Sequence, residues 1–251
     1  MKAAISKLEV ESEVTTRFAT AFKLHEKPPV AVLSTGIAEI DSLTGGLPRG
    51  AITEIFGSAS SGRTSFMLAT LAHATKHDEI CVVIDTNDNF DPPSAAEAGL
   101  NFDQLLWVRC AANLEHAFKA TDLLLQGGGF GLVVLDIGDI PSRESRRIIS
   151  SWWYRFRRVV ENTPTALVVI AQDSCVRSCA SLALQMNRDT DLWSSVNPTQ
   201  INFNHLSLVT KHRSPEKPTH SQLLSSLDLQ ILLKKPAHLG AEKIQIRTTA
   251  Y

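Results

Sequence analysis

A loop of small and hydroxyl-bearing residues has the spacing that phosphate binding requires. It lies between an apolar strand pattern and an apolar helix pattern, and it runs Gly57, Ser58, Ala59, Ser60, Ser61, Gly62, Arg63, Thr64 and Ser65. Small residues let backbone N–H groups curve around a phosphate, and the N-terminus of the following helix adds its positive dipole end. The Thr64 hydroxyl can also ligate Mg²⁺. The loop predicts a nucleotide phosphate site, against the plainer alternative of a Ser/Gly-rich turn.

Arg63 is the single departure from the pattern G-x-x-x-x-G-K-[ST], because it replaces the lysine. Lysine carries a compact charge, whereas arginine is longer, planar and forked. We expect Arg63 to keep the attraction for a polyphosphate while placing its donors wrongly for the group being transferred. The substitution therefore predicts binding without efficient turnover.

Asp136 directly follows four apolar residues at 132–135. An acidic residue at the end of a buried strand is the form of a Walker B motif, whose carboxylate holds Mg²⁺. Any buried strand can end in aspartate, so this signal supports the phosphate loop rather than standing alone. Thr64 and Asp136 are the predicted metal ligands.

Residues 142–160 form a segment with six arginines and one acidic residue. On a helical wheel, the apolar side chains share one arc: Ile148, Ile149, Trp152, Trp153, Phe156, Val159 and Val160. The remaining arc holds the predicted nucleic-acid contacts: Arg143, Arg146, Arg147, Tyr154, Arg155, Arg157 and Arg158. Arginine binds phosphate bidentately and tyrosine can stack on a base. A protein-partner contact and a solvated basic face are the alternatives.

Near-continuous Val, Ile and Leu runs predict strands buried on both faces, as in a parallel sheet covered by helices. The predicted strands are residues 52–56, 81–85, 105–108, 132–136 and 166–171. The predicted helices are residues 64–75, 114–125 and 142–161. Beyond Arg188 the pattern weakens, and residues 203–210, 227–233 and 244–247 are further predicted strands. Residues 1–29 are predicted to be a helix and linker, and residues 30–251 the core domain.

The composition is that of an ordinary globular protein. The chain has 251 residues, is 43% hydrophobic and has a net charge of −1, which excludes a uniformly cationic nucleic-acid binder but leaves room for a local basic patch. No apolar run is long enough for a membrane helix, and early acidic residues at 9, 11 and 13 argue against a secretion signal. Four scattered cysteines favour a reduced, cytoplasmic setting. Cys175 and Cys179 lack a second ligand pair, which favours free thiols over a zinc site.

The order of several motifs resembles the RecA and RadA recombinase family. Ser34-Thr35-Gly36 and Ile40-Asp41 precede Gly45-Gly46-Leu47-Pro48-Arg49-Gly50 and the strand that contains Glu54. These motifs are similar to the family's lead S-T-G…L-D…G-G-L-P-x-G…E-I-x-G. Ile84-Asp85 and Asp91-Pro92 resemble its I-D-A-E-x-x-x-D-P segment, and Gln172 ends the last predicted parallel strand. The resemblance covers residues 33–172.

The resemblance implies a RecA-like P-loop core, an α/β fold with a mainly parallel twisted sheet, helices on both faces and antiparallel strands toward the C-terminus. It implies ATP and Mg²⁺ as cofactors, single-stranded DNA as a partner, self-assembly, and a role in DNA recombination, repair and the SOS response to DNA damage. Asp91 would contact the nucleotide and Gln172 would sense its γ-phosphate. Lys211 and Arg213 would reach a neighbour's ATP, unless they belong to a solvated charged loop.

Several positions depart from the family pattern. Asn87 stands at the place of the catalytic glutamate, and an amide can hold a water but cannot act as a general base. The adjacent Asp88 could substitute only if the end of the strand shifted. Ser94 replaces the tyrosine that stacks on adenine, and residues 138–141 leave little room for a first DNA loop. The second loop, after Gln172, is not glycine-rich.

These departures resemble a diverged RecA paralogue more than a strand-exchange recombinase. ImuA-type proteins, which are RecA-like partners of a translesion polymerase, are one such group. Two functions follow: an ATP-binding DNA repair protein with weak or absent hydrolysis, or a non-catalytic adaptor for a recombinase or translesion polymerase. A small-molecule kinase on a P-loop is disfavoured, because the sequence shows no arginine-rich lid after the core.

Overall fold

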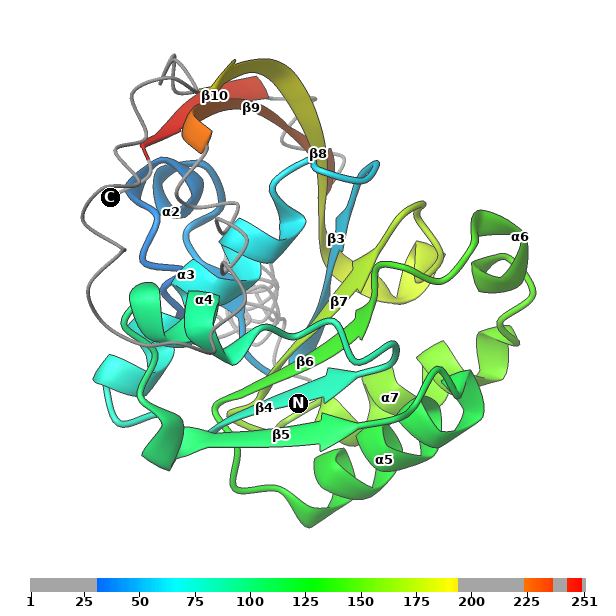
Figure 1. Ribbon diagram of the computed structural model, residues 1–251. Helices are drawn as coiled ribbons and strands as arrows, with labels where there is room; N and C mark the ends of the chain where they lie inside the picture. Colours follow the sequence, from blue (N-terminus) through cyan, green and yellow to red (C-terminus); the bar gives the residue numbers. More distant parts are fainter. Residues whose placement is uncertain (1–30, 194–223, 237–242, 250–251) are drawn as a thin grey trace, which may run out of the picture. The chain divides into compact units, whose positions relative to one another are not determined.

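Eight strands form the main sheet of the computed structural model, which describes residues 31–193, 224–236 and 243–249 (Figure 1). Their order across the sheet is β10-β9-β8-β3-β7-β6-β4-β5. Their bounds are β3 Ala51–Phe56, β4 Cys81–Asp85, β5 Leu105–Arg109, β6 Leu132–Ile137, β7 Ala166–Ala171, β8 Ala180–Trp193, β9 Leu224–Lys235 and β10 Lys243–Thr249. Two short strands, β1 (Val32–Leu33) and β2 (Leu47–Pro48), pair separately.

The middle of the sheet is parallel and its C-terminal side is antiparallel. β3, β7, β6, β4 and β5 run in one direction, and β8 lies parallel to β3. β8, β9 and β10 pair antiparallel to one another. Both features were predicted and are confirmed. The register pairs Phe56 with Ala171 and Asp136 with Ile170, so the carboxyl ends of β3, β7 and β6 meet along one edge.

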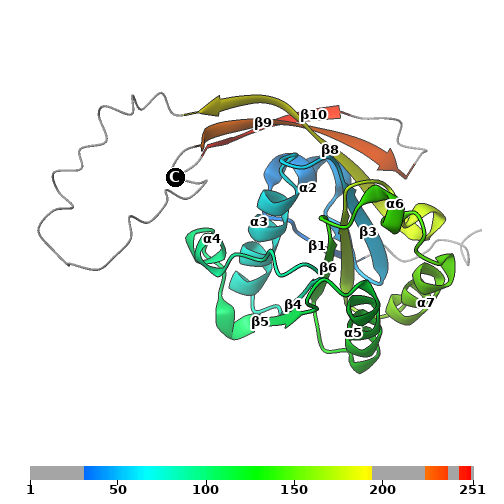
Figure 2. The same ribbon diagram turned by 45° about the vertical axis from the view of Figure 1, so that its right-hand side comes forward.

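Helices cover both faces of the sheet, because successive side chains of each buried strand point to opposite faces. Along β7, Val168 and Ile170 belong to the core beneath helix α3 (Arg63–Lys76), whereas Leu167 and Val169 belong to the core beneath α5 (Leu114–Gly127) and α7 (Ser150–Val160). Figure 2 shows α3 on one side of the sheet and α5 and α7 on the other. Two short helices, α2 (Ala38–Thr44) and α4 (Pro92–Glu97), pack on the α3 side through Ile40 and Ala95.

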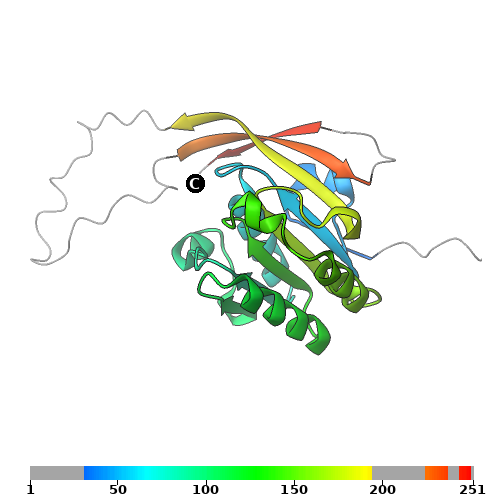
Figure 3. The same cartoon turned by 90° about the vertical axis from the view of Figure 1, so that its right-hand side faces the viewer.

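The long strand β8 is the main element that sequence patterns did not predict. It leaves the centre of the sheet beside β3 and continues into the antiparallel layer with β9 and β10 (Figure 3). Near its start, the buried Leu184 and Met186 alternate with the half-buried Gln185 and Asn187. A strand that changes surroundings along its length lacks a uniform period, so the hydrophobic pattern is weak.

The single helix predicted over residues 142–161 is wrong. The structure has a one-turn helix, α6 (Ser142–Ser145), and then α7, with Ile149 extended at φ −66° and ψ 125° between them. Two adjacent β-branched isoleucines disfavour a continuous helix. Ile148 packs on the core, whereas Ile149 is 67% exposed, so its place on the predicted apolar arc is also wrong.

The remaining predicted elements agree with the structure. The bounds of β4 and β7 match the predictions, and β3, β5, β6, α3 and α5 differ by one or two residues at their ends. Predicted strands 227–233 and 244–247 lie within β9 and β10. The predicted strand 203–210, the helix and linker predicted over residues 1–29, and Lys211 and Arg213 lie outside the described residues. The domain boundary at residue 30 stays a prediction. Among the described helices, none has the length and apolar character to span a bilayer.

Candidate nucleotide site and arginine surface

The phosphate loop joins the end of β3 to the start of α3. Gly62 has a left-handed φ of 86°, and Ser60 has one of 59°. Within the described residues, no side chain caps the N-terminus of α3, and the buried Ser61 Oγ has no hydrogen-bond partner. Uncapped N–H groups at a helix start and an unpartnered hydroxyl fit an anionic ligand. The loop residues therefore fit a nucleotide phosphate.

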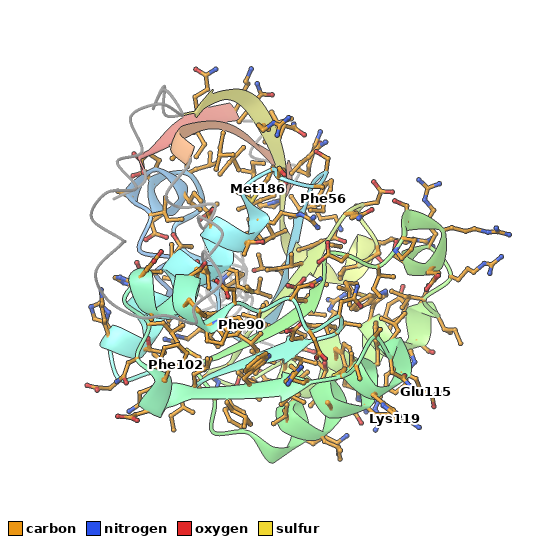
Figure 4. All side chains as sticks on the ribbon, viewed as in Figure 1. Phe56, Phe90, Phe102, Glu115, Lys119 and Met186 are labelled. Atoms are coloured by element: carbon orange, nitrogen blue, oxygen red, sulfur yellow. The ribbon has the colours of Figure 1, made fainter. Side chains whose placement is uncertain are left out.

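The antiparallel layer packs closely over this loop. A Cβ at Gly57 would collide with the carbonyl oxygen of Met186 in β8. A Cβ at Gly62 would lie 2.5 Å from Leu229 Cδ1 in β9. Figure 4 shows Met186 beside Phe56, where β8 runs along β3. Packing therefore requires glycine at both positions, and at Gly62 the left-handed backbone requires it as well.

A cavity of about 460 Å³ opens at the carboxyl ends of β3 and β7. It is lined by Phe56, Gly57, Ser58, Ala59, Ser142, Gln172, Asp173, Gln185 and Asn187. The structure therefore brings the predicted Gln172 to the phosphate loop, although the two are far apart in sequence. Gln185 and Asn187 were not predicted, and the alternation of apolar and polar residues at 184–187 is the signal that could have found them.

Arg63 points away from solvent, toward the end of β6. Arg63 is only 8% exposed, and its NH1 donates a hydrogen bond of 3.0 Å to the Gly138 carbonyl. Burial lowers the pKa of Arg63, while Asp136 and Asp139 act in the opposite direction. The guanidinium is therefore a buried cation within a group of carboxylates.

Asp136, the predicted metal ligand, accepts a hydrogen bond of 2.8 Å from the Gly138 N–H at its Oδ1. Burial raises the pKa of Asp136 to about 6, against the opposing effects of this hydrogen bond and of Arg63. Thr64, the second predicted metal ligand, is exposed at the start of α3. Arg63 rather than Thr64 is thus the loop residue directed at the end of β6.

Three acidic or amide residues near the end of β4 have different surroundings. Asp85 is 1% exposed and accepts hydrogen bonds from Asn89 N, Phe90 N and Trp107 Nε1, so it holds the turn after β4. Within the described residues, the buried Asn87 Oδ1 has no partner. Asp88 Oδ2 lies 3.1 Å from Arg109 NH2 in an ion pair. The carboxylate that could have replaced the missing glutamate is therefore engaged elsewhere.

Asp91, a predicted nucleotide contact, is the N-cap of α4. Its Oδ2 accepts hydrogen bonds from the backbone N–H of Ser94 at 3.0 Å and from Ser94 Oγ at 2.5 Å. Ser94, which stands at the place of the stacking tyrosine, is thus part of a cap. A role of Asp91 in nucleotide binding stays a prediction.

The predicted nucleic-acid residues are all exposed, but they lie on two helical segments. Arg143, Arg146 and Arg147 lie on or just after α6, and Tyr154, Arg155, Arg157 and Arg158 lie on α7. We call these residues the arginine surface. Tyr154 is 55% exposed, with its hydroxyl 3.4 Å from Ser178 Oγ.

Two arginines of this surface have acidic partners that sequence reasoning missed. Arg155 forms a bidentate pair with Asp122 of α5, at 2.6 Å from Nε and 2.5 Å from NH2. Arg146 NH2 lies 3.3 Å from Asp173 Oδ2, next to Gln172. No local spacing indicates either pair, because each joins segments that only the fold brings together.

A groove of about 320 Å³ runs beside the break between α6 and α7. It is lined by Leu114, Glu115, Phe118, Glu144, Arg147, Ile148, Ile149 and Trp152. Figure 4 shows Glu115 and Lys119 on the outer side of α5, where they form an ion pair of 2.7 Å. The arginine surface is therefore bordered by apolar side chains on one side.

Comparisons with known proteins agree with this arrangement. The chain is 34% identical over 162 residues to Protein RecA of Deinococcus radiodurans, covering 58% of this chain and 44% of that protein. It is 40% identical over 113 residues to Protein RecA of Clavibacter michiganensis, covering 44% of this chain and 31% of that protein. The chain thus matches less than half the length of these curated relatives.

The fold is similar to a crystal structure of the RadB recombinase, with a TM-score of 0.61 and 17% identity, covering 87% of this chain and 97% of that one. The family model of the RecA N-terminal domain matches residues 2–143, which include the phosphate loop, Asn87 and Asp136. Because this match spans more than half of the chain, the protein belongs to the RecA family.

Proposed function

We propose that this chain is an ATP-binding RecA-family protein of cytoplasmic DNA recombination or repair, acting in the response to DNA damage. In this proposal the arginine surface binds single-stranded DNA, and ATP hydrolysis is weak or absent. The observation that carries the proposal is the cavity shared by the phosphate loop and Gln172. Ligands of parallel α/β sheets bind outside the carboxyl ends of the strands, which is where this cavity lies.

The same cavity gives the nucleotide a physical connection to the arginine surface. Ser142, the first residue of α6, lines the cavity, and so does Asp173. Asp173 pairs with Arg146, and a hydrogen bond from Ser142 together with Arg146 lowers the pKa of Asp173. A phosphate that contacts Gln172 would therefore act one residue away from an ion pair that holds part of the arginine surface.

Weak hydrolysis follows from the groups at the end of β4. Asn87 supplies an amide where a general base is required, and Asp88 is held by Arg109. Arg63 directs its guanidinium to Gly138 rather than into the shared cavity. We therefore propose that this protein uses nucleotide mainly as a bound ligand.

Titration of a fluorescent ATP analogue tests the nucleotide site. Gly62→Val is a poor test variant, because the left-handed φ and the contact with Leu229 would disturb the fold itself. Ala59→Glu places a negative charge on an exposed loop residue that lines the cavity. It should weaken binding about tenfold or more by repelling phosphate. Leu123→Glu is the matched control, since Leu123 is 70% exposed on α5, on the other face of the sheet.

Fluorescence anisotropy with a labelled single-stranded oligonucleotide, with and without the analogue, tests the DNA arm. Binding that depends on the arginine surface supports the proposal. Absence of both nucleotide and DNA binding by the wild-type protein contradicts it.

A non-catalytic adaptor for a recombinase or translesion polymerase, of the ImuA type, is the second candidate. Arg63 and Asn87 favour it, because both replace residues on which the family's chemistry depends. If wild type binds no DNA but loses a partner of this kind when the arginines are replaced, the arginine surface serves the adaptor function.

A further inference from the structure

The charges around the end of β6 determine what can bind there. Asp136 and Asp139 both stabilise the charged form of Arg63, and Asp85 adds a further negative charge that acts on Asp136. Within the described residues, no cluster of three or more metal-ligating side chains occurs. Arg63 is thus a cation of the chain itself within this acidic group.

Gly138 leaves a space that the Arg63 guanidinium and the Asp136 carboxylate both border. A Cβ at this position would lie 2.9 Å from Arg63 NH1 and 2.9 Å from Asp136 Oδ1. The Gly138 carbonyl accepts from Arg63 and its N–H donates to Asp136. One glycine therefore bridges the cation and the anion through its two backbone groups.

A Mg²⁺ ion held by Thr64 and Asp136 does not fit this arrangement. The ion would share the Asp136 carboxylate with a buried guanidinium, and like charges repel strongly away from bulk water. A lysine at position 63 would present a compact charge, whereas the planar guanidinium of Arg63 donates to the Gly138 carbonyl. The replacement of the lysine therefore brings a guanidinium to the glycine that also binds the predicted metal ligand Asp136.

We infer that Arg63 is the resident cation of the Asp136 carboxylate, so that a nucleotide binds this chain without a divalent cation. The inference rests on the proposed ATP site and adds how that site is neutralised. The Arg63 guanidinium stays with Gly138 and Asp136, while the phosphates meet the uncapped start of α3 and Ser61.

Binding of the fluorescent ATP analogue in Mg²⁺ and in EDTA tests the inference directly. For wild type we expect the two dissociation constants to agree within about twofold. For Arg63→Lys, which returns the carboxylate to a metal, we expect Mg²⁺ to tighten binding by about tenfold or more. The inference is overturned if Mg²⁺ tightens binding to the wild-type protein by about tenfold or more. It is also overturned if the dissociation constant of Arg63→Lys is the same in Mg²⁺ and in EDTA.

A thermal-unfolding cycle tests the Arg63–Asp136 pair independently of nucleotide. Arg63→Gln and Asp136→Asn each leave one charge without its partner, whereas the double variant removes both. Each single variant should lower the melting temperature. We expect the double variant to lower it by clearly less than the sum of the two single decreases. Additive shifts overturn the inference. The matched control is Asp139→Asn, which removes an exposed carboxylate and should couple less to Arg63→Gln.

The two measurements separate this inference from the proposed function. If wild type binds no analogue in either buffer, the ATP site fails, and the unfolding cycle alone decides whether Arg63 neutralises Asp136. If wild type binds only with Mg²⁺, the ATP site stands and the resident cation fails.

Discussion

Glu54 Oε1 accepts a hydrogen bond of 2.7 Å from the backbone N–H of Val176, 122 residues later in the chain. The same oxygen accepts from Cys175 N at 2.5 Å, and Oε2 accepts from Ser174 Oγ at 2.8 Å. Glu54 is 1% exposed inside β3, two residues before the strand ends. A carboxylate in the central strand thus holds the turn that follows Gln172 and keeps this residue at the cavity.

Replacement of Glu54 should therefore destabilise the fold. Glu54→Ala leaves two buried N–H groups without an acceptor, and each such loss costs about 1–3 kcal/mol, so the free energy of unfolding should fall by about 2–6 kcal/mol. Urea unfolding followed by circular dichroism measures this loss. The control Glu115→Ala, on the exposed side of α5, removes only the surface ion pair with Lys119 and should lose about 0.5 kcal/mol or less. Equal stability of the two variants would contradict the role of Glu54.

Arg155 should behave as a structural arginine within the arginine surface. Its partner Asp122 is 7% exposed, so Arg155→Ala leaves a nearly buried carboxylate with Gln126 as its remaining hydrogen-bond partner. We expect a loss of about 1–2 kcal/mol in the free energy of unfolding. Arg158→Ala, on the same helix and exposed, is the matched control and should unfold like wild type. The prediction fails if both variants lose the same stability.

Salt dependence should identify the arginines that contact DNA. Four or five phosphate contacts give a log–log slope of about −3 for single-stranded DNA, and replacing Arg147 and Arg158 with alanine should reduce its magnitude by about 1–1.5. Tyr154→Ala should weaken binding by about 1–3 kcal/mol with little change in slope, because stacking carries no charge. Anisotropy titrations at several salt concentrations measure both effects.

The control for these slopes is a double variant of two exposed basic residues elsewhere, Arg109→Ala with Lys119→Ala. It should bind DNA with the wild-type slope. If the arginine double variant matches wild type at every salt concentration, the arginine surface is not the DNA site.

ATP hydrolysis by the wild-type protein should be slow. Faster hydrolysis should require changes at both Arg63 and Asn87. Loss of a positioned general base lowers rates by about 10²–10⁴-fold. Arg63→Lys combined with Asn87→Glu should raise phosphate release above wild type, because the pair returns a lysine to the phosphate loop and a general base to the turn after β4. Within the described part of the chain, the buried Asn87 Oδ1 has no hydrogen-bond partner. Wild-type phosphate release at the rate of a competent recombinase, stimulated by single-stranded DNA, would overturn the proposed weak hydrolysis.

The four cysteines should be inert in the folded protein. All are buried free thiols, and burial raises the pKa of Cys81 to about 12. Iodoacetamide at pH 8 should label none of them until urea is added, whereas an exposed Ser151→Cys thiol should react at once. Mass spectrometry counts the labels.

The raised pKa of Cys81 also predicts how stability depends on pH. An unfolded thiol ionises near pH 8.5 while Cys81 stays protonated in the fold, so the unfolded state binds fewer protons above that pH. The contribution of Cys81 to the free energy of unfolding is thus complete at neutral pH and falls as the pH rises from about 9 toward 12. Cys81→Ala should reduce this dependence in urea unfolding at several pH values.

The local sequence was sufficient to predict those elements whose residues all have the same surroundings. β4 and β7 have the predicted bounds because strands buried on both faces are continuously apolar, and such a pattern needs no knowledge of neighbours. The phosphate loop, from Gly57 to Thr64, was likewise visible because its small residues and spacing are themselves the requirement. The same continuously apolar runs predicted a parallel sheet, because only strands covered by helices on both faces are buried in this way.

Tertiary structure decided the features that depend on distant partners. The Arg63 side chain is oriented by its hydrogen bond to Gly138, and Arg155 is held in an ion pair by Asp122. The turn after Gln172 is held by Glu54. The helical wheel continued smoothly across residue 149, where the folded chain has an extended residue, with Ile148 packed on the core. A local pattern records which side chains must be buried, but the identity of a buried charge's partner is determined only when the chain has folded.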